Sequence, residues 1–312
     1  MLADLSVQGP AYGRALADRI AIPITEAWSG ADAADLAPSV GSTFATSLPR
    51  TLMLKAAARL TGRTVAVGYS GTVPESPHVW HVYPEGGIGA VCEKLADELG
   101  DAVQTQSPVE AILVENERVV GVRVKGEHIP CAAAVSTAPL PILAKLVQGT
   151  DRVAHLARFR YRPMVFVNLR LAGPSGLRTV VTWTPGPETP FFRLSDIGLG
   201  LPWLVPEGKT LVTADIGCQV GDETWAAPDD ELGQQCIAGL EKLVPGVTAR
   251  YLGCRVMRTP IAYPVYRSEY EADRVKLETG TGVRGLVSVG RNGEFAHILI
   301  CTFRDFVEKR SF

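Results

Sequence analysis

The spacing of apolar residues predicts helices in the first part of the chain. Residues 12–20 and 50–60 follow a helical pattern, and the predicted helices end before Pro23 and at Gly62. The opening segment is therefore expected to be mainly helical.

A third helix is predicted directly after a glycine-rich turn. Ile88, Cys92, Leu95 and Leu99 recur at spacings of four, three and four, and Gly100 follows as a stop signal. One face of this helix is therefore apolar. A short apolar stretch at residues 79–83 precedes the turn and predicts a strand.

Alternating apolar and polar positions then predict β-structure. Residues 109–114 and 119–124 flank a polar turn at residues 115–118, which is the pattern of an antiparallel hairpin with one wet face. A third strand is predicted near residues 129–135. After it come Ser136-Thr137-Ala138-Pro139 and an apolar helix.

The second half of the chain predicts a mostly antiparallel sheet backed by a helix. Its strand-like runs are separated by turns rich in Pro and Gly, and they cover residues 164–171, 179–183, 191–195 and 210–216. The helix opens with acidic residues 229–231, which suit the positive end of the helix dipole. Its apolar face consists of Leu232, Cys236, Leu240 and Leu243, and Pro245-Gly246 ends it.

The last predicted strand, at residues 285–289, runs into Gly290-Arg291-Asn292-Gly293-Glu294 and an apolar helix. Glycines let the backbone approach a ligand, and a helix N-terminus offers N–H groups to an anion. Such a turn taken alone is more often a packing turn. Arg291 favours the phosphate interpretation, whereas Glu294 could merely face the helix dipole.

A second glycine turn, Tyr83-Pro84-Glu85-Gly86-Gly87-Ile88-Gly89, leaves room for a flat ligand but is a common pattern. The nearby Trp80, His78 and His81 are more simply partly buried residues than catalytic ones. Residues 280–285 spell G-x-G-x-x-G but precede a strand, so they do not predict a dinucleotide site. No motif for phosphotransfer, serine hydrolysis or metalloprotease chemistry occurs.

Composition narrows the partners of this chain. Its 312 residues carry 31 Lys and Arg against 33 Asp and Glu, a formal charge of −2, which argues against nucleic acid and for a small-molecule substrate. The six cysteines show no metal-ligand or C-x-x-C spacing, so no metal site is predicted and reduced thiols in the cytoplasm are expected. We also expect no signal peptide and no transmembrane segment.

Four segments together resemble one enzyme superfamily. They are residues 82–87, residues 107–112, residues 135–139 and residues 290–294, in this order, and Ala262-Tyr263-Pro264-Val265-Tyr266 adds a further similarity. The chain resembles FAD-dependent oxidoreductases of the flavin amine oxidase, protoporphyrinogen oxidase and phytoene desaturase superfamily, with UDP-galactopyranose mutase as a relative. The similarity covers roughly residues 12–300.

The resemblance implies an FAD cofactor and a set of residues that bind it. Val109 would begin the strand that meets the adenine, and Gly86 and Gly87 would lie near the flavin. The turn that closes over the pyrophosphate, ribityl chain and flavin ring would contain Gly290, Arg291, Asn292, Gly293 and Glu294. Substrate candidates are Tyr263 and Tyr266, although a buried ring with a bonded hydroxyl is the simpler interpretation. Arg160 and Arg162 could meet an acidic substrate, but a solvated strand end is the simpler expectation.

The implied fold class is α/β (α+β): an incomplete FAD-binding domain of the glutathione-reductase-like type plus a substrate domain with a mostly antiparallel sheet backed by helices. Residues 1–78 would form a helical part of the substrate domain and residues 79–150 a segment of the FAD domain. Residues 151–280 would supply the substrate-domain sheet, and residues 281–312 the C-terminal strand, turn and helix.

Family members open with a strand, G-x-G-x-x-G and a helix, and this sequence contains no such unit. Residues 301–306 also leave the expected pattern. A truncated form is therefore expected.

The implied function is an FAD-dependent oxidoreductase whose flavin takes a hydride or electrons from a C–N or C–H bond of a small organic substrate. Two alternatives are a non-catalytic ligand-binding fragment and a flavin-dependent isomerase of the UDP-galactopyranose mutase type. The sequence assigns neither catalytic residues nor an oligomeric state.

Overall fold

The computed structural model describes residues 17–37 and 83–295, together with the single residues 15, 53, 56 and 60. The helix predicted at residues 50–60 falls almost wholly outside them. The strand predicted at residues 79–83, with His78, Trp80 and His81, also lies outside them except for its last residue. The helix predicted after Glu294 lies outside them except for Phe295, and residues 301–306 lie wholly outside them.

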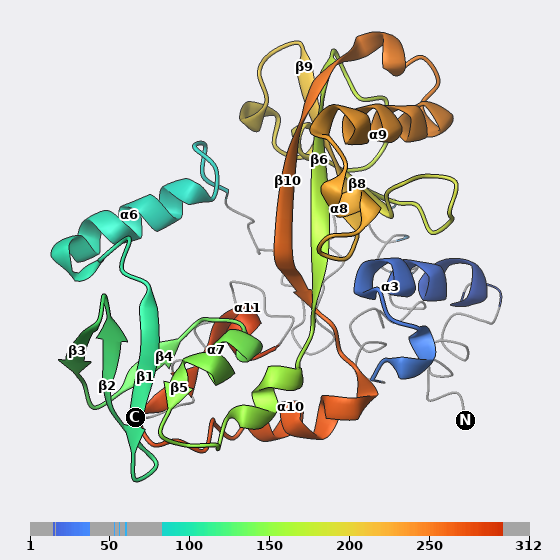
Figure 1. Cartoon of the computed structure of the whole chain (residues 1–312). Helices are drawn as coiled ribbons and strands as arrows, with labels where there is room; N and C mark the ends of the chain where they lie inside the picture. Colours follow the sequence, from blue (N-terminus) through green and yellow to red (C-terminus); the bar gives the residue numbers. More distant parts are fainter. Residues whose placement is uncertain are drawn as a thin grey trace. The chain divides into compact units, whose positions relative to one another are not determined.

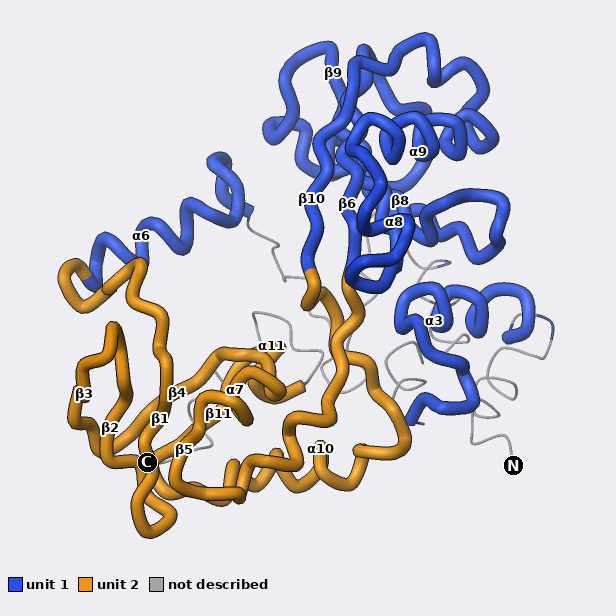
Figure 2. Tube along the Cα trace, viewed as in Figure 1, with its two compact units in different colours: residues 1–99, 164–259 blue, residues 100–163, 260–312 orange. Residues whose placement is uncertain are grey.

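The chain divides into two compact units. Unit 1 contains residues 1–99 and 164–259, and unit 2 contains residues 100–163 and 260–312. The division passes through two long strands, β6 (Tyr161–Ala172) and β10 (Tyr251–Pro264) (Figure 2).

Unit 1 is built on a five-stranded sheet in the order β10-β6-β9-β8-β7. The remaining strands are β7 (Val181–Trp183), β8 (Arg193–Asp196) and β9 (Lys209–Gly217), and β6, β9, β8 and β7 pair antiparallel in turn. The predicted antiparallel sheet is therefore confirmed. The sequence did not predict β10, which lies at the sheet edge beside β6 (Figure 1).

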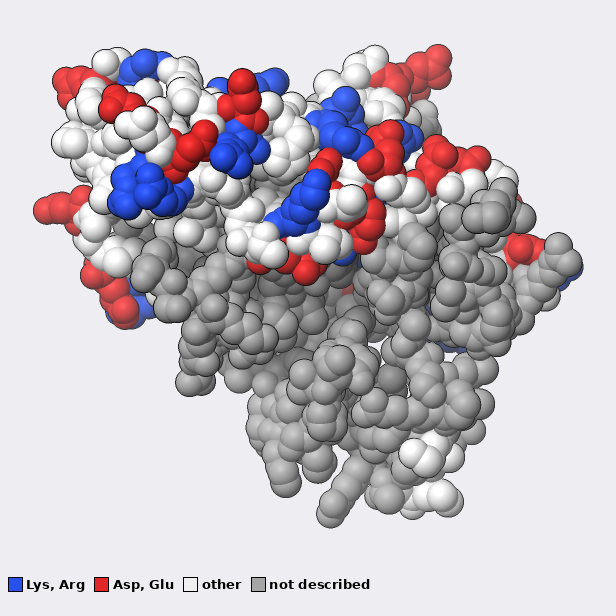
Figure 3. All heavy atoms as spheres, turned by 90° about the horizontal axis from the view of Figure 1, so that it is seen from below, with Lys and Arg blue, Asp and Glu red and all other residues white. Residues whose placement is uncertain are grey.

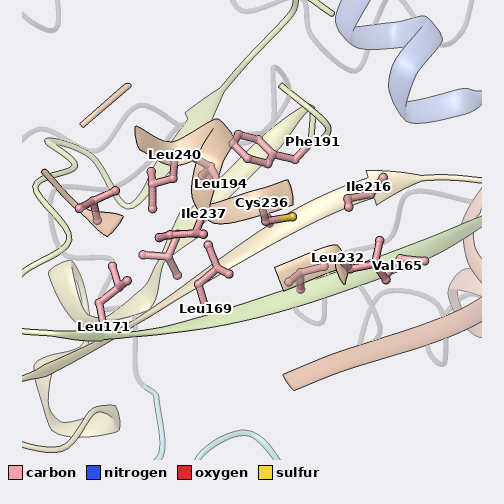
Figure 4. Packing of buried hydrophobic residues seen from close by; sticks show 14 of the residues in the cluster. Val165, Leu169, Leu171, Phe191, Leu194, Ile216, Leu232, Cys236, Ile237 and Leu240 are labelled. Atoms are coloured by element: carbon pink, nitrogen blue, oxygen red, sulfur yellow. The ribbon is translucent and has the colours of Figure 1, made fainter. Parts of the chain in front are cut away.

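Helix α9 (Asp229–Leu243) covers one face of this sheet and spans the predicted residues. Alternate residues of β6 and β9 point to that face, as the period of two in a strand requires. The cluster in Figure 4 joins them to the helix, and its members include Val165, Leu169, Leu171, Leu194, Ile216, Leu232, Cys236, Ile237 and Leu240. Burial of these side chains removes a continuous apolar surface from water.

The described N-terminal part of unit 1 corrects one expectation. A π-helical turn at Ala17–Ala21 runs directly into α3 (Ile22–Ser29), so Pro23 does not end the helical segment. Pro23 lies in the first turn of α3, a position at which proline is tolerated. Helix α6 (Gly89–Leu99) occupies the predicted residues and ends before Gly100, but none of its residues is buried.

Unit 2 contains the predicted hairpin. β1 (Val109–Glu115) and β2 (Arg118–Val124) pair antiparallel, and β3 (Glu127–Pro130) and β5 (Val147–Gln148) complete the order β3-β2-β1-β5. The single third strand predicted near residues 129–135 is wrong. The chain leaves this sheet after Pro130 and starts a separate strand, β4 (Ala134–Ser136).

β4 leaves the first sheet because its partner is β11 (Leu286–Ser288), with which it pairs parallel. Gly285 makes the approach possible: a Cβ there would lie 2.4 Å from the carbonyl oxygen of Ala132. Helix α7 (Leu140–Leu146) follows β4 as predicted, and α10 (Glu271–Leu277) precedes β11.

The remaining helical elements are short. They are α8 (Glu223–Ala226), α11 (Gly290–Gly293) and turns of 3-10 helix at Ala33–Asp35, Gly100–Ala102, Ala154–Arg158, Ile197–Leu199, Pro202–Leu204, Thr248–Arg250 and Ser268–Tyr270.

Charges of both signs are mixed on the face drawn in Figure 3, and no continuous basic patch appears on its described part. Ion pairs along α10 illustrate the mixing, since Arg274 pairs with Glu271 and Glu278, and Asp273 pairs with Arg158 and Lys276.

Candidate functional site

The predicted turn follows β11 directly and is fixed to β4. The Val289 N–H donates to the Ser136 carbonyl oxygen at 2.8 Å, and the buried Ser288 hydroxyl donates to the Gly293 carbonyl oxygen at 2.6 Å. A Cβ on Gly293 would lie 2.8 Å from the Ser288 Oγ. Gly293 is thus required for packing of the turn against its own strand.

Gly290 has a different role. Its φ is +78°, a backbone conformation that L side chains rarely adopt, and a Cβ there would meet nothing within 4 Å. The structure therefore places a left-handed glycine beside open space at the start of α11. Glu294 closes the turn, since its N–H donates to the Gly290 carbonyl oxygen at 2.8 Å.

The turn brings cofactor and substrate candidates together within unit 2. The guanidinium carbon of Arg291 lies 5.2 Å from the centroid of the Tyr263 ring, within the range of a cation–π contact. Tyr263 is half-buried at the end of β10. The second substrate candidate, Tyr266, is buried, and its ring centroid lies 5.3 Å from that of Phe295.

Phe295 is the centre of an aromatic cluster at the end of the turn. Its ring meets four others edge-on, with centroid distances between 4.7 and 5.7 Å. These partners are Phe159, Tyr161, Tyr266 and Tyr270. Edge-to-face packing of this kind is favourable beyond the buried area, so the cluster stabilises the end of the turn.

Tyr161 connects three segments of this site through one hydroxyl. It donates to the Asn292 carbonyl oxygen at 2.5 Å and accepts from the Leu140 N–H at 3.2 Å. Burial raises the pKa of the Tyr161 hydroxyl far above its ordinary value. Sequence reasoning missed Tyr161 and Phe295. Only the position of Tyr161 between the considered Arg160 and Arg162 pointed toward it.

Two buried polar atoms of the site have no hydrogen-bond partner among the described residues. They are the Tyr266 hydroxyl and the Asn292 Oδ1. Burial raises the pKa of Tyr266 to about 12, while the positive charge of Arg291 acts in the opposite direction. Because an unsatisfied buried polar group is costly, such atoms mark positions where a ligand or water completes the bonding.

The other predicted site residues lie elsewhere. Val109 begins β1 in the four-stranded sheet and is 41% exposed. Gly86 and Gly87 belong to unit 1, in a turn where the Gly87 N–H donates to the Pro84 carbonyl oxygen at 3.0 Å. Gly87 has φ +86° and open space around its Cβ position, as Gly290 has. That Val109, Gly86 and Gly87 belong to the same cofactor site as Gly290 remains a prediction.

Arg160 is exposed and donates to the Ala157 carbonyl oxygen at 3.3 Å. No group of three His, Cys, Asp or Glu side chains in the described part of the chain could hold a metal ion.

Across the described residues, no helix has both the length and the apolar character to cross a bilayer. The glycines at 280, 282 and 285 precede β11, as the sequence indicated, and do not open a helix.

Unit 2 thus contains a parallel strand pair followed by a glycine turn, and unit 1 contains a mainly antiparallel sheet. The family model for flavin containing amine oxidoreductase matches residues 8–291, and the chain belongs to this family. The family match confirms the resemblance found in the sequence.

Solved structures show the same fold. A reduced UDP-galactopyranose mutase is 17% identical with a TM-score of 0.69, and the alignment covers 92% of this chain and 61% of that one. A protein assigned as protoporphyrinogen oxidase from Exiguobacterium sp. is 16% identical with a TM-score of 0.61 and the same coverage. Putrescine oxidase bound to putrescine is 13% identical with a TM-score of 0.53, covering 72% and 53%.

The chain therefore spans about three fifths of the length of the UDP-galactopyranose mutase and of the Exiguobacterium protein. None of the curated proteins compared with the chain matches it.

The residues of the turn fit a flavin. Gly290 offers open space beside its backbone, Arg291 supplies a positive charge, and Asn292 and Tyr266 each present an unsatisfied buried atom. These features come from α11 and from the segment after β10. They could hold one polar, partly anionic ligand by backbone approach, charge and hydrogen bonding.

Proposed function

We propose that this chain is part of an FAD-dependent oxidoreductase that acts on a small organic substrate. The single observation that carries the proposal is the turn after β11. There an open left-handed Gly290 and Arg291 adjoin Asn292, whose Oδ1 is buried without a partner among the described residues. When bound, the flavin would accept a hydride or electrons from a C–N or C–H bond.

The chain's own residues would bind and orient this cofactor. Gly290 would let the backbone approach the dinucleotide, and Arg291 would supply a positive charge to its pyrophosphate. The Tyr266 hydroxyl and the Asn292 side chain would donate and accept hydrogen bonds at its polar edge. Tyr161 acts on the site indirectly, because its hydroxyl holds the Asn292 carbonyl in place.

The proposal extends to the other predicted site residues. Val109 would meet the adenine, and Gly86, Gly87, Gly293 and Glu294 would complete the cofactor site. Tyr263 would lie on the substrate side. Residues 151–280 would then form the substrate domain, with residues 1–78 as its helical part, while residues 79–150 and 281–312 would serve the FAD domain.

Titration of the purified full chain with FAD tests the proposal directly. Saturable quenching of flavin fluorescence with FAD, and weaker quenching with FMN or riboflavin, would support a dinucleotide site. The variant Gly290→Val should weaken FAD binding because it fills the open space and strains the backbone. Gly208→Val is the matched control, since Gly208 also has positive φ and open space but lies before β9. If the full chain does not quench the fluorescence of FAD in a saturable way, the proposal is contradicted.

The two alternative functions predict other results. A flavin-dependent isomerase of the mutase type would bind FAD and convert its substrate without net oxidation. A non-catalytic binding fragment would bind a small ligand with no flavin present. Measuring flavin reduction by candidate amines under anaerobic conditions separates these outcomes from that of an oxidase.

A further inference from the structure

The sheet of unit 1 carries a row of unlike side chains on the face opposite its core. Trp183 on β7 is directly across from Arg193 on β8, and Arg193 is directly across from Asp215 on β9. Phe166 on β6 continues the row beside Asp215. Since residues directly opposite in a sheet project from the same face, these four side chains are neighbours.

Two of the interactions of the Arg193 guanidinium connect members of the row. Arg193 donates through Nη2 to the Asp215 carboxylate and lies over the Trp183 ring, 5.5 Å from its centroid. The indole is also stacked on Phe192, whose centroid is 6.1 Å away. Arg193 and Trp183 are therefore oriented before any ligand arrives, which lowers the entropic cost of binding.

A buried ion pair of this kind needs a reason other than stability. The Asp215 side chain is 1% exposed, and removing a carboxylate from water costs free energy that an ion pair often fails to recover. Replacing a buried ion pair with apolar residues is often neutral or stabilising. The pair is better explained as a device that fixes the position of Arg193.

The exposed parts of Arg193 and Trp183 indicate which kind of ligand would fit the row. The Arg193 side chain is 26% exposed and Trp183 is 39% exposed, whereas Asp215 is closed to solvent. An approaching solute thus meets a cation and an indole at the edge of the sheet, because β7 is its last strand. These groups complement an anion attached to a flat ring.

We propose that Trp183 and Arg193 form a binding site for a small aromatic acid, in which the ring contacts the indole and the carboxylate meets the guanidinium. The row continues inward through Asp215, which orients the site without touching the ligand. All four residues of the row belong to unit 1.

Calorimetric titration of the full chain without added flavin tests the site with three probes. These are 2-naphthoate, its saturated analogue decahydronaphthalene-2-carboxylate, which lacks the aromatic ring, and 2-naphthamide, which lacks the charge. We expect 2-naphthoate to bind about tenfold more tightly than either analogue. Equal affinities, or no binding of 2-naphthoate, would overturn the proposal.

Two tryptophan variants locate the binding. Trp183→Ala should lower the affinity for 2-naphthoate about tenfold or more. Trp203→Ala is the matched control, because Trp203 is 52% exposed in the same unit and lies outside the row. An equal loss in both variants would show that the probe binds elsewhere or nonspecifically.

The double variant Arg193→Met with Asp215→Leu removes the charge without leaving one ion buried alone. It should bind 2-naphthoate and 2-naphthamide equally. A remaining preference for 2-naphthoate would contradict the role of Arg193. If the double variant does not fold, the comparison of probes on the unmodified chain and on Trp183→Ala still decides the proposal.

Discussion

The guanidinium of Arg291 covers the ring of Tyr263, with 5.2 Å between its central carbon and the ring centroid. The two residues were predicted separately, Arg291 as a cofactor residue and Tyr263 as a substrate residue. Their contact places the end of β10 beside the turn after β11. A change at Arg291 should therefore affect cofactor and substrate binding together.

Replacing Arg291 with Met should lower the affinity for FAD about tenfold, because the proposed site would lose the positive charge assigned to the pyrophosphate. Fluorescence titration measures this change. Arg118→Met is the control, since Arg118 is an exposed arginine of the same unit at the start of β2. Unchanged affinity in Arg291→Met would remove this residue from the cofactor site.

Two glycines with the same φ should respond differently to alanine. Gly290 and Gly285 have φ of +78° and +77°, so either substitution places an L side chain in the left-handed region at a cost of about 1–2 kcal/mol. Only at Gly285 would the new Cβ meet a backbone oxygen, at 2.4 Å. We expect Gly285→Ala to be less stable than Gly290→Ala by about 1–3 kcal/mol in urea unfolding. Equal losses would contradict the packing role of Gly285.

The hydroxyls of Tyr161 and Tyr266 should have opposite effects on stability. Tyr161→Phe breaks two hydrogen bonds and leaves the Leu140 N–H and Asn292 carbonyl without them, so a loss of about 1–3 kcal/mol is expected. Tyr266→Phe removes a buried hydroxyl with no partner among the described residues. It should be neutral or stabilising by up to about 1 kcal/mol.

Titration of the Tyr161→Phe and Tyr266→Phe variants with FAD tests whether the Tyr266 hydroxyl binds the cofactor. If the Tyr266 hydroxyl contacts the cofactor, Tyr266→Phe should weaken FAD binding while its unfolding midpoint is unchanged or higher. A variant that is both as stable and as tightly bound as the natural chain would show that this hydroxyl has no part in cofactor binding.

Local patterns were sufficient to predict part of the fold. The hairpin of β1 and β2 follows from alternation around a polar turn, and α9 follows from its acidic start, its apolar face and Pro245-Gly246. Both depend on residues close together in the sequence. The same is true of β11 and the turn that follows it.

Pairing between distant segments explains the failures. β4 separates from β3 because its partner, β11, lies about 150 residues further along the chain. β10 was not predicted because apolar and polar residues do not alternate regularly along it and because it contains Gly253 and Pro260. Its side chains are accordingly mostly half-exposed. Tyr161 and Phe295 became part of the site only through tertiary contact.

The loop after α9 should show a pH-dependent contribution from Glu241. Its carboxylate accepts from the Gly246 N–H at 2.5 Å, from the Thr248 N–H at 2.8 Å and from the Thr248 hydroxyl at 2.7 Å. These bonds lower the pKa of Glu241 below its ordinary value of 4.5. The folded state therefore favours the charged form, so this contribution is present above pH 4.5 and is lost as the pH falls through the lowered pKa.

Glu241→Gln should accordingly have a lower urea midpoint than the natural chain at neutral pH, and the difference should shrink in acid. Glu207→Gln is the control in the same unit, because Glu207 is an exposed carboxylate outside the helices. It should show a smaller effect at neutral pH. A difference for Glu241→Gln that stays constant from neutral to acid pH would show that the carboxylate charge does not stabilise this loop.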